Sequence, residues 1–423
     1  MTIFDIAAIL IAIAAISGYL NHRLLHLPQT SGTLLIALVS SLVVLAVERL
    51  VPDVHLQAGV EDFLGRIDFD QTLMHGLLCF LLFAGALHVD LEGLISNRWT
   101  IGLLSTMGVL LSTAIVGLLT WLVFSLLGFR LDLFVCLTFG ALISPTDPIA
   151  VMGLLKELRA PRSLEAQIAG ESLFNDGVGV VVFLALSSLA NLEGSAGTHA
   201  GSEWVQLAMF ALREVVGGIG AGLVLGYVAY RALKSIDDYP LELLITLALV
   251  MFLYSLSFWM HVSGPIAVVV AGLLIGNPGR RLAMSARTRE HVDGFWSMID
   301  EILNAVLFLL LGLEVFAVER WSDVLLPAVA TIPICLLARF VSVGIPVRAM
   351  HVPGTLGRGL IPVLTWSGLR GGISIALALA LPGFDGKDIQ LASTYAVVVF
   401  SVLVQGLTVP RVLVDYGIGQ HAG

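Results

Sequence analysis

One ten-residue stretch carries side chains that are suited to hold a small cation. Residues 170–179 read Gly-Glu-Ser-Leu-Phe-Asn-Asp-Gly-Val-Gly. On a helix, Ser172 and Asp176 lie one turn apart, and Glu171 and Asn175 lie one turn apart on the adjoining face. Such oxygens suit a hard alkali cation, and burial disfavours the charged form of a carboxylate. A buried Asp176 could therefore exchange a proton for a cation. The alternative is a polar cluster that only packs helices together.

Two other stretches contain residues that interrupt helices. Residues 144–148 read Ser-Pro-Thr-Asp-Pro, and a continuous helix cannot pass through two prolines so close together. Residues 367–372 read Ser-Gly-Leu-Arg-Gly-Gly, which combines helix-weakening glycines with one charge. The free ends of broken helices carry partial charges of both signs, which Asp147 and Arg370 could compensate. The alternatives are a proline kink with a capping Asp147 and glycines that permit close helix packing.

The composition places these stretches in a membrane. Of the 423 residues, 57% are apolar and only 13% are charged. Soluble domains have about 45–50% apolar and about 25% charged residues. These values exclude a soluble globule and a disordered chain. The net charge of −9 argues against a nucleic-acid partner, so we expect the lipid bilayer to be the main partner.

Apolar segments long enough to cross a bilayer, which takes about 20 residues, follow one another along the whole chain. They predict an all-α polytopic protein with about 13 transmembrane helices in a single domain over residues 1–423. Because the fifth and twelfth segments are interrupted, we expect two inverted six-helix repeats whose broken helices cross at a binding site. The segments are 3–25, 30–50, 71–91, 98–128, 131–155, 163–192, 203–234, 239–260, 262–277, 287–318, 321–350, 358–381 and 389–415.

The basic residues predict the orientation in the membrane. The connections after odd-numbered segments carry fourteen Lys and Arg residues, and the connections on the other side carry five. Because Lys and Arg accumulate on the cytoplasmic side, we expect an amino terminus outside and a carboxyl terminus inside a plasma membrane. Arg213, Arg339 and Arg370 remain at membrane depth, where a charge costs about 2.5–3.5 kcal/mol and normally faces the protein interior.

A stripe of small residues, Gly218, Gly222 and Gly226, occupies one face of the seventh segment. Such stripes let two helices approach closely. The sequence leaves open whether the stripe serves packing within the chain or contact between two subunits.

The three motifs together make this chain similar to the bacterial NhaP-type sodium/proton antiporters of monovalent cation:proton antiporter family 1. The resemblance runs over essentially the whole chain and implies a secondary transporter, not an enzyme. It would exchange a monovalent cation, Na⁺ or also Li⁺ or K⁺, for H⁺ by alternating access, with no cofactor. The resemblance further implies a homodimer, with a mobile core from residues 98–192 and 321–415 and a scaffold from residues 3–91 and 203–318.

The resemblance also implies roles for single residues. It places the cation, which competes with a proton, at Asp176. Ser172 and the main chain of Thr146 would contribute oxygens, with Asp147 close by. An Asn-Asp pair like Asn175 and Asp176 belongs to the electroneutral branch of the family. It therefore implies that one cation is exchanged for one proton.

Two further expectations follow from the same resemblance. Glu171 would form a structural ion pair with the buried Arg339, and Arg370 would supply the charge at the second helix break. Many relatives carry a Glu in the third segment at the position of Ala84, within Leu-Phe-Ala-Gly-Ala-Leu at residues 82–87. Without that acid, the cation ligands and the ion selectivity of those relatives cannot simply be carried over.

Two other functions remain open from the sequence. A cation-coupled solute symporter or a channel would also use broken helices, but it would more naturally show a polar pocket for an organic substrate. An intramembrane aspartyl protease would use Asp147 and Asp176 as a catalytic dyad. Such a protease needs glycines before one aspartate, whereas Gly177 and Gly179 follow Asp176. No Gly-x4-Gly-Lys-Ser/Thr nucleotide motif is present.

Overall fold

The computed structural model describes residues 3–51, 77–190, 203–317, 321–349, 359–381, 383–384 and 386–418. Within these ranges the regular elements are helices, joined at one place by an isolated β-bridge. Nine of the described helices are long and apolar enough to cross a membrane. The prediction of an all-α, multi-pass membrane protein is therefore confirmed, whereas the count of thirteen crossings and the inverted repeats stay predictions.

The helices of the first half follow the expected segments closely. Residues 71–76 of the third segment and 191–192 of the sixth lie outside the described residues. The elements are α1 (Ile3–Leu20), η1 (Asn21–Leu25), α2 (Gln29–Leu50), α4 (Leu78–His88), α5 (Leu91–Ser96), α6 (Arg98–Leu103), η3 (Leu104–Gly108), α7 (Val109–Leu126), α8 (Leu133–Ile143), α9 (Ile149–Glu157) and α10 (Arg162–Leu189).

The second half continues in the same way. Residues 318, 350 and 358, at the ends of expected segments, lie outside the described residues. The elements are α11 (Glu203–Leu233), α12 (Tyr239–Met260), α13 (Gly264–Leu274), η4 (Ile275–Gly279), α14 (Arg280–Leu282), α15 (Ala286–Leu313), η5 (Glu314–Ala317), α16 (Trp321–Ala349), α17 (Leu360–Trp366), α18 (Gly372–Leu379), α19 (Lys387–Phe400), η7 (Ser401–Gln405) and α20 (Gly406–Asp415).

The boundary between α12 and α13 lies where the sequence predicts it. His261 adopts a left-handed backbone with φ 53°, which ends α12. Ser263 then caps the next helix, because its side chain accepts a hydrogen bond from the amide of Ile266. A short turn between two separately capped helices explains why one long apolar stretch folds into two elements.

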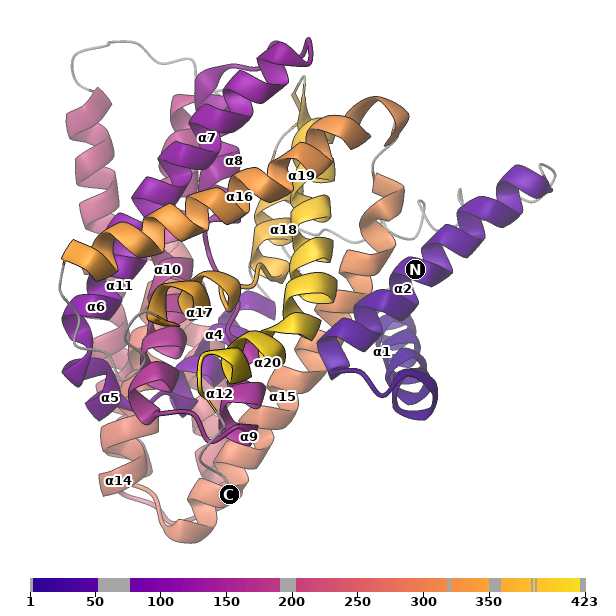
Figure 1. Cartoon of the computed structure of the whole chain (residues 1–423). Coiled ribbons are helices and arrows are strands. Elements are labelled where there is room, and N and C mark those ends of the chain that lie inside the picture. The colour runs from indigo at the N-terminus through magenta and orange to yellow at the C-terminus, as the bar shows by residue number, and fades with distance from the viewer. Residues whose placement is uncertain are drawn as a thin grey trace.

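The described helices pack in two groups. One group joins α7, α8, α10, α16 and α19, and Figure 1 shows α16 lying obliquely across it. The other group joins α4, α11, α12 and α13 with α15. Trp296 of α15, fully buried, packs there against Phe83 of α4, with ring centroids 4.6 Å apart. The helices α1 and α2 lie to one side and contact α15 (Figure 1).

The glycine stripe of α11 serves packing within the chain. A Cβ at Gly218 would lie 2.7 Å from the main-chain oxygen of Ser263, and the Cβ of an alanine at Gly222 would meet the main-chain oxygen of Ala267. Both of these oxygens belong to α13 or to its cap. Glycine therefore permits the close approach of α11 and α13, and the structure decides between the two interpretations that the sequence left open.

Candidate functional site

The two helix breaks cross each other near the centre of the molecule. The first break separates α8 from α9, and the second separates α17 from α18. Pro145 and Pro148 lack the amide hydrogens that a continuous helix would need, so the helix stops at Ile143 and resumes at Ile149. The amide of Asp147 donates instead to the carbonyl oxygen of Leu369 at 2.8 Å, which forms the isolated antiparallel bridge.

Arg370 neutralises the carboxyl end of α8. Its side chain is 3% exposed, and Nη1 donates to the carbonyl oxygens of Ser144 and Pro145, the second at 3.0 Å. Carbonyl groups at the end of a helix carry partial negative charge, so they suit a guanidinium. The backbone amide of Arg370 is fixed by the hydroxyl of Ser401 at 2.7 Å. The positive charge of Arg370, which belongs to the second break, therefore stabilises the carboxyl end of α8 at the first break.

The carboxylate of Asp147 lies at the beginning of α18. Any side chain at Gly371, the residue before that helix, would collide with Oδ2 of Asp147. The amino terminus of a helix carries partial positive charge, which a carboxylate compensates. The structure therefore brings each of the two charges to the helix end of opposite sign, and glycine at position 371 makes that approach possible.

Polar side chains of α10 hold the first break in place. The amide of Asn175 donates to Oγ1 of Thr146 at 2.8 Å and its oxygen accepts from the backbone amide of Thr146 at 3.2 Å. The hydroxyl groups of Ser172 and Thr146 are 3.0 Å apart. All three side chains are buried. Thr146 lines the cavity described next, and Ser172 and Asn175 lie behind it in this conformation.

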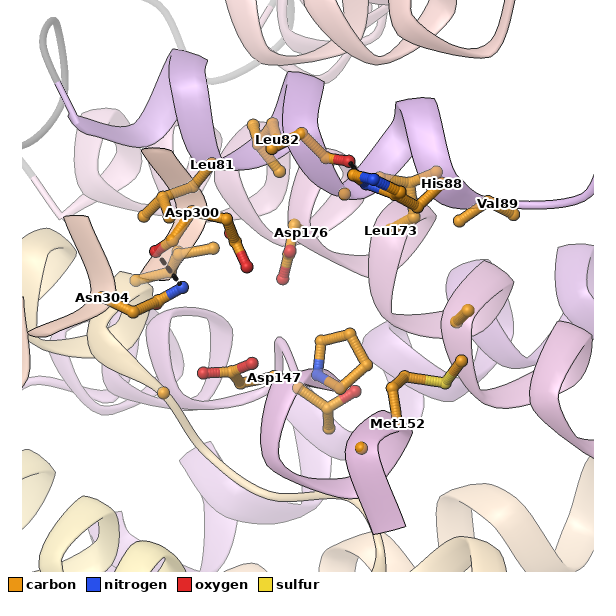
Figure 2. A pocket seen from close by; sticks show the side chains of 18 of the residues that line it. Leu81, Leu82, His88, Val89, Asp147, Met152, Leu173, Asp176, Asp300 and Asn304 are labelled. Atoms are coloured by element: carbon orange, nitrogen blue, oxygen red, sulfur yellow. Dashed lines mark hydrogen bonds between the residues drawn. The ribbon is translucent and has the colours of Figure 1, made fainter. Parts of the chain in front are cut away.

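Asp176 faces a cavity of about 680 Å³. Only 7% of the residue is exposed, and no described donor or cation bonds to its carboxylate. Figure 2 shows the carboxyl groups of Asp147, Asp176 and Asp300 directed towards the same open space from three different elements. Burying an unpaired carboxylate is unfavourable, so Asp176 needs a proton or a cation as its partner.

The carboxylates around this cavity do not form a cage for a resident metal ion. In the described part of the chain, no three His, Cys, Asp or Glu side chains come together closely enough to hold one. A single carboxylate with neutral oxygens nearby offers few and weak ligands. Such an arrangement suits a cation that binds and leaves.

The cavity extends to the connection between α9 and α10. Lys156 and Arg162 form part of its wall at that end, together with Glu165. These basic residues belong to the side on which the sequence accumulates Lys and Arg. Asp176 and Asp147 are therefore reached from the basic side of the protein.

Glu171 and Arg339 form a buried ion pair beside the crossing. Nη2 of Arg339 lies 3.1 Å from Oε2 of Glu171, and Nη1 donates to Oε1. Nη2 also donates to the carbonyl oxygen of Leu364 in α17 at 3.1 Å. Glu171 is 2% and Arg339 7% exposed. The pair thus connects α10 and α16 with the helix that precedes the second break.

Besides Ser297, Glu301 and Leu307, two further residues of α15 that the sequence did not single out line the cavity, Asp300 and Asn304. They lie one turn apart, and the amide of Asn304 donates to the main-chain oxygen of Asp300 at 2.8 Å. The sequence could have pointed to these two residues, because an acid and an amide one turn apart precede a run of apolar residues, 305–311, that is buried. Ala84, where relatives were expected to carry an acid, lines the same cavity.

Comparisons with known proteins identify relatives of this chain. A family model described as the transmembrane region of sodium/hydrogen exchangers matches residues 10–415. The chain is 45% identical to the Na⁺/H⁺ antiporter NhaP of Pseudomonas aeruginosa over 96% of this chain and 95% of that protein. It is 36% identical to the Na⁺/H⁺ antiporter NhaH of Halobacillus aidingensis over 83% and 84%.

A solved structure shares the fold. The sodium proton antiporter MjNhaP1 of Methanocaldococcus jannaschii superposes with a TM-score of 0.76, covering 97% of each chain at 17% sequence identity. At that identity the likeness concerns the arrangement of the helices.

Proposed function

Because this chain belongs to the family of transmembrane sodium/hydrogen exchangers, we propose that it exchanges Na⁺ for H⁺ across a plasma membrane. Members of this family are transporters, which excludes the intramembrane protease that the two aspartates left open. A related NhaP and a related NhaH are both named as Na⁺/H⁺ antiporters, and this supports Na⁺ as the cation. Li⁺ and K⁺ are the other cations to be tested.

The observation that carries this proposal is the buried carboxylate of Asp176, which faces the cavity without a described partner. In the low-dielectric interior, a lone negative charge is unfavourable. Asp176 therefore holds either a proton or a cation, and the arrival of one requires the departure of the other. Thr146 lies beside it on the cavity wall and supplies neutral oxygens, held by Ser172 and Asn175.

One cation is exchanged for one proton in this scheme. Two neighbouring charges have fixed partners: Arg370 on the end of α8 and Arg339 on Glu171. Position 175 is an amide whose oxygen and nitrogen both bond to Thr146, so it adds no second acid. Asp176 is then the one residue of α10 that carries either the cation or the proton. Because one positive charge moves in each direction, a cycle moves no net charge.

The cation changes sides by movement of one helix group against the other. Residues 98–192 and 321–415, which contain both breaks, form the moving core, and residues 3–91 and 203–318 form the scaffold and the dimer contact. The two packing groups of the described helices support this division, since the cavity lies between α10 and α15. With the amino terminus outside, the cavity that reaches Lys156 opens to the cytoplasm.

Purified protein in liposomes that contain a pH-sensitive dye tests the proposal. We expect an outward Na⁺ gradient to drive H⁺ into the lumen, and choline to drive none. Li⁺ and K⁺, tested in the same way, define the selectivity. If folded protein moves no H⁺ in response to any of the three metal cations over a pH series, the proposal is wrong.

A one-for-one exchange predicts that the membrane potential has no effect on the rate. We expect the initial rate of Na⁺-driven H⁺ movement to change by less than about 20% when a K⁺ diffusion potential of about 100 mV is imposed with valinomycin. Moving one net charge through that potential is worth about 2.3 kcal/mol, which would change the driving force visibly. A rate that follows the sign of the potential would contradict the stoichiometry while leaving the exchange itself intact.

A further inference from the structure

Asp300 places a further carboxylate on the wall of the cavity that Asp176 faces. It lies on α15, in the helix group that does not contain the breaks, and it lines the same cavity. Figure 2 shows its carboxyl group directed into the space that Asp147 and Asp176 also face. Asp147 and Asp300 are close enough for their charges to interact. The negative charge around the cavity therefore comes from both helix groups.

The basic side chains described near the cavity are either bound elsewhere or lie at its end. Arg370 is bound to helix carbonyls, and the basic residues that line the cavity, Lys156 and Arg162, belong to the connection at its end. Neither Asp176 nor Asp300 takes part in an ion pair among the described residues. Ion pairs in the described part of the chain include Arg280 with Asp293, Arg281 with Glu92 and Arg339 with Glu171.

Helix α4, which packs beside α15 in the same group, does not contribute a negative charge to the cavity wall. Ala84 of α4 lines the cavity and is 1% exposed, but it carries no polar side chain. The ring of His88, one turn further along, is bonded through Nδ1 to the carbonyl oxygen of Ala84 at 2.7 Å, and Nε2 lies 3.3 Å from the hydroxyl of Ser297. Asp300 and its neighbour Glu301 are thus the acids that α15 contributes to the cavity wall, and α4 contributes none.

The carboxylate of Asp176 is buried and has no described partner. It therefore indicates that this acidic cavity binds a cationic ligand. A cleft with low-dielectric walls and charge of one sign concentrates counter-ions, with effects of about 10- to 1000-fold on local concentration and association. Among the described residues, no three His, Cys, Asp or Glu side chains come together to hold an ion, so the cavity presents its carboxylates separately rather than as one closed cage. A cation that enters the cavity can therefore meet one aspartate before the other.

We propose that Asp300 is a second cation-binding residue, which receives the hydrated monovalent cation in the cavity and delivers it to Asp176. The inference rests on the proposed exchange at Asp176 and adds a receiving position to it. Because Asp300 belongs to the scaffold, it faces Asp176 only while the cavity is open on this side. Its effect is therefore confined to cations that enter from the basic side of the protein.

The test compares Asp300→Asn with the unchanged protein in inside-out and right-side-out membrane vesicles. We expect the Na⁺ concentration at half-maximal rate to rise about tenfold in the vesicles that present the basic side, and to stay within about twofold in the others. The maximal rate at saturating Na⁺ should be retained in both. Glu290→Gln, which removes an exposed charge from the same helix, is the matched control and should leave both values unchanged.

A second measurement separates attraction by charge from a structural role. Added choline chloride screens long-range attraction, so it should raise the half-maximal Na⁺ concentration of the unchanged protein and of Asp300→Glu. The same salt should have a smaller effect on Asp300→Asn, in which Asp147 and Asp176 remain. A structural defect would not reduce this salt dependence.

Three results would overturn the role of Asp300: an unchanged half-maximal Na⁺ concentration, an equal rise from both sides, or a loss of maximal rate at unchanged affinity. These outcomes require that the unchanged protein exchanges Na⁺ for H⁺. If the unchanged protein and Glu290→Gln both fail to do so, the proposed function itself is wrong.

Discussion

Asp176→Asn is expected to reduce Na⁺-driven H⁺ movement in liposomes to the level of vesicles without protein. The amide has nearly the same size and shape, but it carries no charge for Na⁺ and cannot exchange a proton. A cation and a carboxylate about 4 Å apart attract each other by about 4 kcal/mol in a partly polar protein environment, so affinity should fall about a thousandfold. The measurement is the initial rate of the dye signal over a range of Na⁺ concentrations.

The control for this variant is Asp237→Asn, the same chemical change at an exposed position between α11 and α12. It should transport like the unchanged protein. Asp176→Asn should also elute from size exclusion and unfold thermally as the unchanged protein does, because removing an unpaired buried charge costs the fold nothing. Substantial exchange by a well-folded Asp176→Asn would show that another residue carries the ion.

Arg339→Met is expected to destabilise the protein by about 3–5 kcal/mol, the usual cost of leaving one buried charge of a pair alone. The substitution leaves the carboxylate of Glu171 uncompensated and removes the hydrogen bond to the carbonyl of Leu364. Thermal unfolding in detergent, followed by tryptophan fluorescence, measures the loss. Transport should fall only in proportion to the folded protein that reaches the membrane.

The double variant Glu171→Met with Arg339→Met distinguishes charge balance from simple packing. Replacing both members of a buried pair by apolar side chains of similar volume is often neutral, so most of the lost stability should return. The double variant should then transport again. A double variant as unstable as Arg339→Met alone would mean that the hydrogen bond to α17, rather than the ion pair, holds this region together.

Much of the architecture follows from local properties of the sequence. Hydropathy locates the helices because a membrane span must be continuously apolar for about 20 residues. The breaks are located by the prolines at 145 and 148 and the glycines at 371 and 372. Proline lacks the amide hydrogen that a helix needs, and glycine has a low helix propensity. Such signals depend only on neighbours along the chain.

The contacts across the site needed the three-dimensional structure. From the sequence, Arg370 was a charge that could compensate a helix end, but nothing local identified the carbonyls of Ser144 and Pro145 as its partners. Asp300 was not singled out, because nothing local distinguishes it from the other acids of its segment, Asp293 among them. Its place on the cavity wall depends on how α15 packs beside α4 and α18.

The hydrogen bond between Asp147 and Leu369 means that two distant segments of the chain together form the proposed cation site. An amino-terminal fragment would keep Asp176 and still lack Arg370, the group that satisfies the exposed end of α8. A carboxyl-terminal fragment would lack the strand of backbone against which its own break rests. Truncated or split versions should consequently show no cation exchange on their own. Exchange should return only through complementation, when both fragments assemble within one bilayer.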